Sequence, residues 1–177
     1  MRSNSAFTFV EVLIVVIILG IAASLIIPQF GTRDDLQTTA AARLVMGDLM
    51  YAQNRAIATQ KKHYVEFNGS SYTLYARDSD TSALYGLTQP ITGNPYTIAF
   101  GSSNLNFPTT QIASISFDST PLKAIQFDSL GLPSVYNSST DTATALANTG
   151  TITLSTTSNT FPTYITIDPN TGEASVQ

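Results

Sequence analysis

Residues 7–27 read FTFVEVLIVVIILGIAASLII, an apolar run that contains a single charged residue, Glu11. A helix needs about 20 mostly apolar residues to cross a bilayer, so the length of this run predicts a transmembrane helix. An acid within such a helix costs roughly 2.5–3.5 kcal/mol at its centre on insertion scales, and less near its end. Because some interaction must offset that cost, we expect Glu11 to be a functional residue.

Two simpler interpretations explain this segment less well. A secretory signal peptide has a basic start, an apolar stretch of about 7–15 residues and small residues at its cleavage site. Arg2 and the small residues at 22–24 fit its two ends, but the apolar stretch is too long and carries Glu11 near its start. A plain membrane anchor, with Arg2 on the inner side, fits the length and leaves the acid unexplained.

A short polar leader precedes the apolar run. Its last residues, Ser5 and Ala6, are followed by Phe7, and Glu11 and Pro28 stand at fixed distances from that Phe. This arrangement resembles the class III leader of type IV pilins and pseudopilins, which a prepilin peptidase cuts on the cytoplasmic side just before a Phe. The resemblance implies a cut between Ala6 and Phe7, N-methylation of Phe7 and a helix kink at Pro28. Ala6 stands where the family usually has Gly.

The position of the acid also has a physical explanation. Cleavage before Phe7 would create an α-amino group that is largely protonated at neutral pH. In a bundle of stacked subunits, each Glu11 carboxylate could pair with the amine of an adjacent copy, so that two charges compensate each other in a low-dielectric core. Removing one partner of a buried pair costs about 3–5 kcal/mol. We therefore predict that Glu11 is an assembly contact and not a catalyst.

Composition limits the possibilities for the rest of the chain. The protein has 177 residues, a net charge of -4 and no cysteine, which leaves room for one domain of ordinary size and excludes disulfides and thiolate metal sites. Beyond His63 the sequence is anionic, because two basic residues accompany eight acidic ones. These are Arg77 and Lys123 against Glu66, Asp78, Asp80, Asp118, Asp128, Asp141, Asp168 and Glu173.

After Pro28 a helical period continues to about residue 60, now as an amphipathic pattern. A helix running from residue 7 to there would be roughly 80 Å long at 1.5 Å per residue, with a bend or local melt near Pro28, Gly31, Asp34 and Asp35. We expect its apolar stripe to pack one helix face against a sheet as ordinary core. The stripe consists of Leu36, Ala40, Leu44, Gly47, Tyr51, Asn54 and Ala58, with Val45, Leu49, Ala52 and Ala56 beside it.

After Lys62 the apolar period changes to two, which indicates strands. Residues 63–68 and 71–76 flank Gly69 and Ser70 and predict a hairpin. The segments 78–95 and 137–150 are rich in turn residues and are predicted to be solvated loops. Further strands are predicted at 96–100, 112–117, 123–128, 151–155, 163–168 and 173–177, the last two joined over 169–172.

These patterns together predict an α+β fold, in which a long N-terminal helix packs on a mostly antiparallel β domain. We expect four parts. They are a leader at 1–6, a transmembrane or filament-core helix at 7–30, an amphipathic helix at 31–62 and a β-rich globular domain at 63–177.

The sequence after the N-terminal helix points to one group within this family. Residues 49–57 (LMYAQNRAI), 125–134 (IQFDSLGLPS), 151–155 and 163–176 are similar, in this order, to segments of the H-type minor pseudopilins of type II secretion and the related FimU/FimT-like minor pilins. Gln53 stands where that group often has Arg. The resemblance favours a minor over a major subunit and implies a pilin-like fold.

The same resemblance implies partners and a location. The partners would be other pilin or pseudopilin subunits, the prepilin peptidase, membrane lipid and an inner-membrane assembly platform with its cytoplasmic ATPase. The precursor would cross the bacterial inner membrane once, with its N-terminus in the cytoplasm and its globular domain outside. It would then join a periplasmic or extracellular filament. The machine that the filament serves, whether secretion, twitching, adhesion or DNA uptake, stays open.

Catalytic and metal sites have weak signals. His63, the only histidine, would have to serve any Ser-His-Asp triad, and its place beside Lys62 suggests a surface residue. Asp78 with Asp80, or Asp168 with Glu173, could hold a hard cation through oxygen ligands, but neither pair has the spacing of a calcium loop. We expect solvated loop acids, no enzyme activity and no cofactor.

Two binding roles remain as alternatives to a purely structural subunit. Nucleic acid is disfavoured as a partner, because phosphate contacts need Lys and Arg and the basic residues at 55–62 end a helix, where cations are favoured anyway. A filament-displayed adhesin or ligand-binding module would carry its specificity in the loops at 78–95 and 137–150, with Tyr85 and Tyr136 as the aromatic residues in or beside them.

Overall fold

The computed structural model describes residues 8–26, 33–78, 82–101, 107–120, 122–158 and 162–177. The chain divides into two compact units, Met1–Arg33 and Asp34–Gln177, and each is considered by itself. Ala6, Phe7 and Pro28, which the sequence assigns to leader cleavage, methylation and a helix kink, lie outside the described residues.

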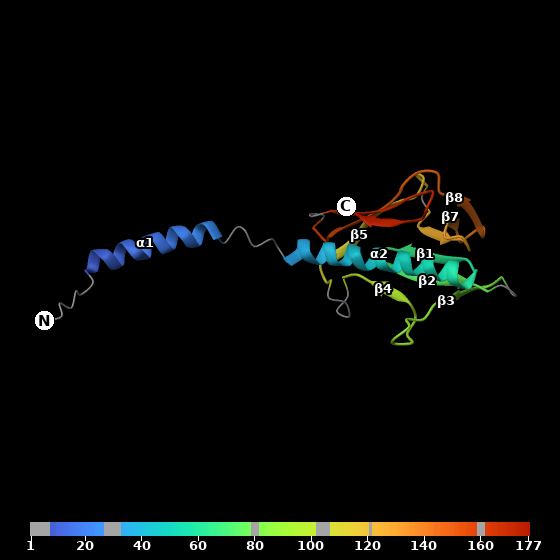
Figure 1. The fold of residues 1–177 in the computed structure, drawn as a ribbon, viewed down its shortest axis with the longest axis horizontal. Helices are drawn as coiled ribbons and strands as arrows, with labels where there is room; N and C mark the ends of the chain where they lie inside the picture. The colour runs from blue at the N-terminus through green and yellow to red at the C-terminus, as the bar shows by residue number, and fades with distance from the viewer. Residues whose placement is uncertain (1–7, 27–32, 79–81, 102–106, 121, 159–161) are drawn as a thin grey trace. The chain divides into compact units, whose positions relative to one another are not determined.

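Residues 9–26 of the first unit form the helix α1 (Phe9–Ile26) (Figure 1). Its large apolar side chains at residues 9–21 are all exposed, on every side of the helix. A helix that is apolar all round needs surroundings that bury it. The predicted span at 7–27 extends beyond the described residues at both ends. Among the described residues, no helix is long and apolar enough to cross a membrane.

The next helix is α2 (Arg33–Thr59), which from Asp34 onward belongs to the second unit. The burial predicted for Val45, Leu49, Ala52 and Ala56 is confirmed, but the rest of the predicted stripe is not buried. Leu36 is 69% exposed, and Ala40, Gly47, Asn54 and Ala58 are exposed as well. Alanines occur on both the buried and the exposed faces of α2, so apolar periodicity alone did not separate the two faces. The buried residues are Thr38, Ala41, Ala42, Val45, Asp48, Leu49, Ala52 and Ala56.

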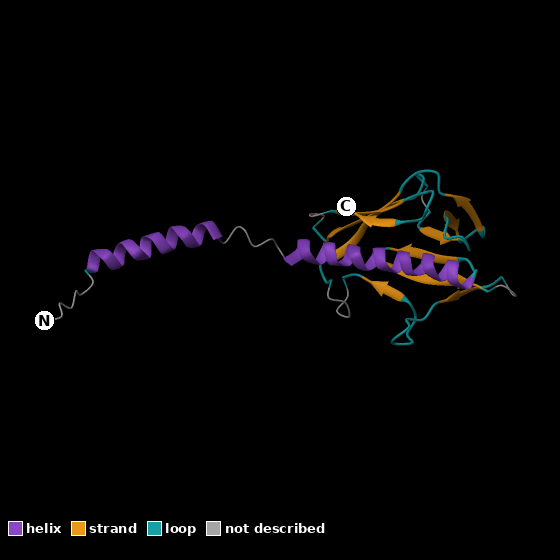
Figure 2. Cartoon of the chain, in the orientation of Figure 1, coloured by secondary structure: helices purple, strands orange, loops and turns teal. Residues whose placement is uncertain are grey.

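Two antiparallel sheets pack with α2, which Figure 2 shows running across both. The larger has the order β3-β2-β1-β6-β7-β8, with β4 also paired to β2, and the smaller has the order β11-β10-β9-β5. The strands of the larger sheet are β1 (His63–Asn68), β2 (Ser71–Arg77), β3 (Leu84–Gly86), β4 (Thr97–Ala99), β6 (Ala124–Phe127), β7 (Pro133–Asn137) and β8 (Thr142–Ala145). Those of the smaller sheet are β5 (Thr110–Ser116), β9 (Gly150–Thr156), β10 (Thr163–Ile167) and β11 (Ala174–Val176).

One hydrophobic core joins α2 to both sheets. It combines alanines of the helix with alternate residues of the strands, such as Val65 and Phe67 on β1 and Ile165 and Ile167 on β10. The predicted α+β fold, with a helix packed on antiparallel β structure, is confirmed. The predicted hairpin is confirmed as well, since Asn68 pairs with Ser71 across the turn between β1 and β2.

Three strands were absent from the sequence prediction. β3 and β8 form within the segments predicted to be loops, and β7 lies just before the second of them. Every residue of β3 and β8 is exposed, so neither strand has the alternation of apolar and polar residues that marks a half-buried strand. Their structure comes from pairing with β2 and β7. They are edge strands whose extended structure is held by hydrogen bonding to the neighbouring strands.

Candidate functional site

The first turn of α1 holds Glu11, the acid that the sequence singles out. Thr8 precedes the helix, and its hydroxyl oxygen lies 3.3 Å from the backbone nitrogen of Glu11, which donates to it. Thr8 and Glu11 thus occupy the N-cap and N3 positions of the capping-box pattern, a signal that the sequence prediction overlooked. Acids in a first helical turn also interact favourably with the helix dipole. The position of Glu11 is therefore explained by stabilisation of the helix start, in addition to the assembly contact that the sequence predicts.

The carboxylate of Glu11 is available to another molecule. Its residue is exposed, and within the described part of the chain the ion pair found joins Arg77 and Asp141, with none at Glu11. The apolar side chains around it are equally exposed. Among its described residues, the first unit therefore presents one acid without an ion-pair partner on an otherwise apolar helix.

Gln53 of α2 joins the helix to two turns of the β structure. Its side-chain nitrogen Nε2 donates to the carbonyl oxygens of Gly131, at 2.9 Å, and Thr171, at 2.7 Å. Gly131 lies between β6 and β7, and Thr171 lies between β10 and β11. The residue that replaces the Arg of the resembling group thus fastens one turn from each sheet to the helix.

The junction at Gln53 also requires glycine at one neighbouring position. Gly172 has a φ of +71°, and a Cβ atom there would lie 2.6 Å from the carbonyl oxygen of Gly131 and 2.7 Å from Nε2 of Gln53. No side chain fits in that space without displacing backbone. The two turns and the helix therefore meet at van der Waals contact.

His63 is buried, and its prediction as a surface residue was wrong. It is 1% exposed and stands at the start of β1, on the same strand face as the core residues Val65 and Phe67. Its Nδ1 lies 3.0 Å from the carbonyl oxygen of Lys61, and burial lowers its pKa. The adjacent Lys62 suggested a surface position. His63 is buried because its side chain lies on the face of β1 that packs into the core. His63 is a packed core residue with a backbone partner.

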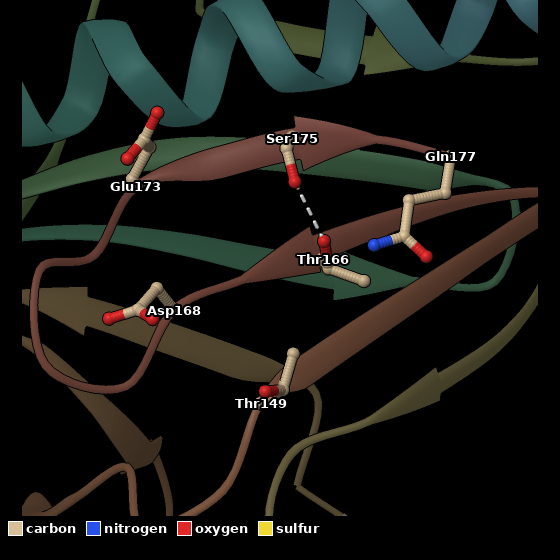
Figure 3. A pocket seen from close by; sticks show the side chains of 6 residues that line it. All are labelled: Thr149, Thr166, Asp168, Glu173, Ser175 and Gln177. Atoms are coloured by element: carbon tan, nitrogen blue, oxygen red, sulfur yellow. Dashed lines mark hydrogen bonds between the residues drawn. The ribbon is translucent and has the colours of Figure 1, made fainter.

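Asp168 and Glu173, one of the two candidate cation pairs, flank the turn between β10 and β11 (Figure 3). They line a hollow of about 340 Å³. The Asp168 carboxylate accepts hydrogen bonds from the backbone N–H groups of Asn170, at 2.8 Å, and Thr171, at 2.9 Å. These bonds, first that of Asn170, lower the pKa of Asp168. Asp168 thus acts as the acceptor that organises this turn.

No grouping of metal ligands accompanies these acids. The described residues contain no cluster of three or more His, Cys, Asp or Glu side chains that could hold a metal ion. In the same hollow, the hydroxyls of Thr166 and Ser175 lie 2.8 Å apart and bond to each other. Asp80, of the other candidate pair, lies outside the described residues.

The basic residue of β2, Arg77, is neutralised. It forms an ion pair with Asp141, and hydrogen bonds from Arg77 and then Tyr136 lower the pKa of that carboxyl. Tyr136, predicted to be a loop aromatic, is 4% exposed and belongs to β7. That prediction failed because β7 and β8 fold the segment back onto the sheet. An arginine engaged in this way has few donors left for another molecule.

A buried carboxylate on α2 was missed by the sequence prediction. Asp48 is 6% exposed, and it accepts hydrogen bonds from the hydroxyls of Tyr72, at 2.5 Å, and Tyr96, at 2.8 Å. Burial raises its pKa, against the opposing effect of the two tyrosine bonds. The available signal was spacing, since residue 48 falls within the buried series that includes Val45, Leu49 and Ala52. The site ties α2 to the edge of the larger sheet.

Comparison with known proteins agrees with this architecture. The family described as the prokaryotic N-terminal methylation motif matches residues 1–27. The chain is 35% identical, over 94 residues, to type II secretion system core protein G of Pseudomonas aeruginosa; the similarity covers 53% of this chain and 56% of that protein. The chain thus spans only about half the length of this relative.

A solved structure supports the same fold. The minor pseudopilin EpsH from the type 2 secretion system of Vibrio cholerae superposes with a TM-score of 0.56, covering 80% of this chain and 96% of the other at 10% identity. At that identity the likeness concerns the fold alone. The motif match concerns residues 1–27, and the structural match concerns the fold. The chain therefore carries the N-terminal methylation motif, resembles core protein G over about half its length and shares its fold with a minor pseudopilin.

Proposed function

We propose that this protein is a structural subunit of a type II secretion pseudopilus, of the H-type minor pseudopilin kind, and has no catalytic activity. The observation that carries the proposal is the N-terminal methylation motif at residues 1–27, which contains the unpaired acid Glu11. The similarity to core protein G supports a role in secretion. The fold shared with EpsH supports the minor-pseudopilin assignment.

The proposed sequence of events starts from the N-terminal segment. The precursor is held in the inner membrane by this segment, with the globular domain outside. The prepilin peptidase cuts between Ala6 and Phe7, and the new amine of Phe7 is methylated without losing its charge. The subunit then joins other pseudopilins through an inner-membrane assembly platform, with Glu11 paired to the amine of a neighbouring subunit and Pro28 bending the chain beyond the filament core.

Changing Glu11 tests the assembly role. Glu11→Ala and Glu11→Gln should insert into the membrane normally, but should reduce incorporation into pseudopili on the order of 100-fold. This magnitude is expected because losing one partner of a buried pair costs about 3 kcal/mol or more and each 1.4 kcal/mol is about a factor of ten. The measurement is the fraction of subunit recovered in cross-linked oligomers, relative to the membrane fraction, in cells that assemble the machine.

The capping geometry supplies matched controls for the charge. Gln can replace Glu at N3 of a capping box, so Glu11→Gln removes the charge and keeps a side chain suited to the cap. Thr8→Ala removes the cap observed at Glu11 and keeps the charge, so it should assemble nearly as the unaltered chain does. Normal assembly of Glu11→Gln, or equal losses in Glu11→Gln and Thr8→Ala, would refute the pairing.

Blocking the leader cut tests the processing step separately. Ala6→Glu places a charged side chain at the predicted cleavage position, where the resembling family has a small residue. We expect the chain to keep its precursor mass and to lack N-methylated Phe7, as measured by intact mass and N-terminal peptide mass spectrometry. An unchanged mature mass would mean that the cut lies elsewhere.

A further inference from the structure

The outer face of the seven-stranded sheet contains a polar hollow of about 260 Å³. Tyr64 on β1 and Gln126 on β6 are directly paired across the sheet, and both line this hollow. Their strand neighbours Val65 and Ile125 belong to the core. Because successive residues of a strand point to opposite faces, the hollow lies on the side of the sheet away from that core.

One wall of the hollow is held rigidly by Arg77. Its Nε donates to the Tyr64 hydroxyl at 2.8 Å, and its Nη1 donates to the carbonyl oxygen of Ser82 at 2.8 Å. Both terminal nitrogens also bond to Asp141, and Nη2 bonds to the Tyr136 hydroxyl at 3.3 Å. A guanidinium group has five N–H donors, and these five bonds use all of them. Arg77 therefore shapes the hollow and has no donor left for a ligand.

Three other donors remain unused. Gln126 is only 4% exposed and lines the hollow, yet its side-chain amide forms no hydrogen bond with any described residue. The Tyr64 hydroxyl accepts from Arg77, but its own proton has no acceptor in the same part of the chain. Lys62, at the rim, is exposed and forms no ion pair there. Among the described side chains, the polar atom that is fully enclosed without a partner is Oγ1 of Thr110. The Gln126 amide therefore reaches the solvent of the hollow and is available to a ligand.

The free groups define the chemistry of that ligand. An ammonium, a phenolic O–H and an amide NH₂ are donors, and a carboxylate accepts several such bonds with one negative charge to match the charge of Lys62. A doubly charged phosphate would place excess charge beside Asp141. A sugar stacked on an aromatic face finds no platform, because Tyr64 and Tyr136 are 2% and 4% exposed.

We propose that this hollow binds a carboxylate group, contributed either by an acidic segment of a partner protein or by a small organic acid. The site is separate from the N-terminal segment that carries the proposed assembly function, and nothing in that function requires it. Lys62 would supply the attractive charge. Tyr64 and Gln126 would orient the carboxylate through two hydrogen bonds.

The test is a titration of the full-length, ¹⁵N-labelled chain in detergent micelles, at constant ionic strength, followed through the backbone amide resonance of residue 126. The probes are sodium acetate, an end-blocked triglutamate peptide, its triglutamine counterpart and inorganic phosphate. We expect saturable shifts with acetate and triglutamate, and none with triglutamine. Tighter binding of triglutamate than of acetate points to a partner protein, and equal or weaker binding points to a small acid.

Two variants and a control make the result specific. Lys62→Gln changes an exposed residue and should weaken carboxylate binding at least fivefold; Gln126→Leu should weaken it similarly. Lys123→Gln removes a lysine that does not line the hollow, and it should bind as the unaltered chain does. The proposal is overturned by the absence of a saturable shift, by equal weakening in Lys62→Gln and Lys123→Gln, or by phosphate binding more tightly than either carboxylate.

Discussion

Gly172→Ala is expected to destabilise the globular unit by about 2–5 kcal/mol, the sum of a left-handed backbone cost of about 1–2 kcal/mol and an overpacking cost of about 1–3 kcal/mol. The φ of Gly172 is +71°, and the added Cβ would lie 2.6 Å from the carbonyl oxygen of Gly131. The obstacle is backbone, which cannot rotate away as a flexible side chain can. The free energy of unfolding would be measured by urea denaturation of the full-length chain in micelles, followed by the near-ultraviolet circular dichroism of its tyrosines.

A substitution at a second glycine, Gly93, separates the backbone cost from the overpacking cost. Gly93 has nearly the same φ, +69°, but a Cβ there would meet nothing within 4 Å. Gly93→Ala should therefore show only the backbone cost, about 1–2 kcal/mol. Equal destabilisation by the two substitutions would show that the close approach of the turns at Gln53 contributes nothing.

Tyr72→Phe is expected to destabilise the globular unit by about 1.5–3 kcal/mol at neutral pH, the range for a hydrogen bond to a charged group. The substitution removes the hydroxyl that lies 2.5 Å from the Asp48 carboxylate and leaves the buried charge with Tyr96. Tyr72 is itself 1% exposed, so water cannot easily replace the lost donor. The same urea denaturation measures the effect.

The pH dependence of this loss has a definite sign. Burial raises the pKa of Asp48 above its ordinary value of 3.8, so the folded state holds this proton more tightly than the unfolded state does. The resulting stabilisation is complete below pH 3.8 and disappears as the pH rises through the raised folded value. The Tyr72 bond lowers that pKa, so its removal raises the pKa further. The destabilisation by Tyr72→Phe should therefore be small in acid and grow with pH.

Two further variants check this interpretation. Asp48→Asn cannot ionise, so stability in this variant should lose the part of its pH dependence that comes from the carboxylate. Tyr164→Phe alters a tyrosine that is 44% exposed and should change stability by less than about 0.5 kcal/mol. A loss in Tyr72→Phe that stays constant from acid to neutral pH would mean that the hydroxyl acts on packing and not on the charge of Asp48.

The sequence was sufficient to predict those features that depend on residues close together in the chain. The resemblance to type IV pilins and pseudopilins was visible in the residues at 5–28, because helix length, a lone acid and a proline stand at short fixed spacings. The hairpin at Gly69 and the alternating strands were also predictable, since a period of two over six residues decides which face is buried. The assembly roles of Ala6, Phe7, Glu11 and Pro28 stay predictions, as does the four-part division of the chain.

The tertiary structure decided the features that depend on residues far apart in the chain. Strand pairing placed His63 on the core face of β1 and ordered β3 and β8 without any periodic signal of their own. The packing of α2 on the sheets decided which of its apolar residues are buried. Tertiary packing brought the Asp48 carboxylate within hydrogen-bond distance of the Tyr72 and Tyr96 hydroxyls. It also left Gln126 only 4% exposed, without a side-chain hydrogen bond to any described residue. Spacing along the sequence therefore predicted the helices, the hairpin and the strands with an alternating pattern, and it carries the resemblance at the N-terminus. The exposed edge strands, the burial of individual residues and the polar contacts arose only from the long-range contacts that bring the elements together.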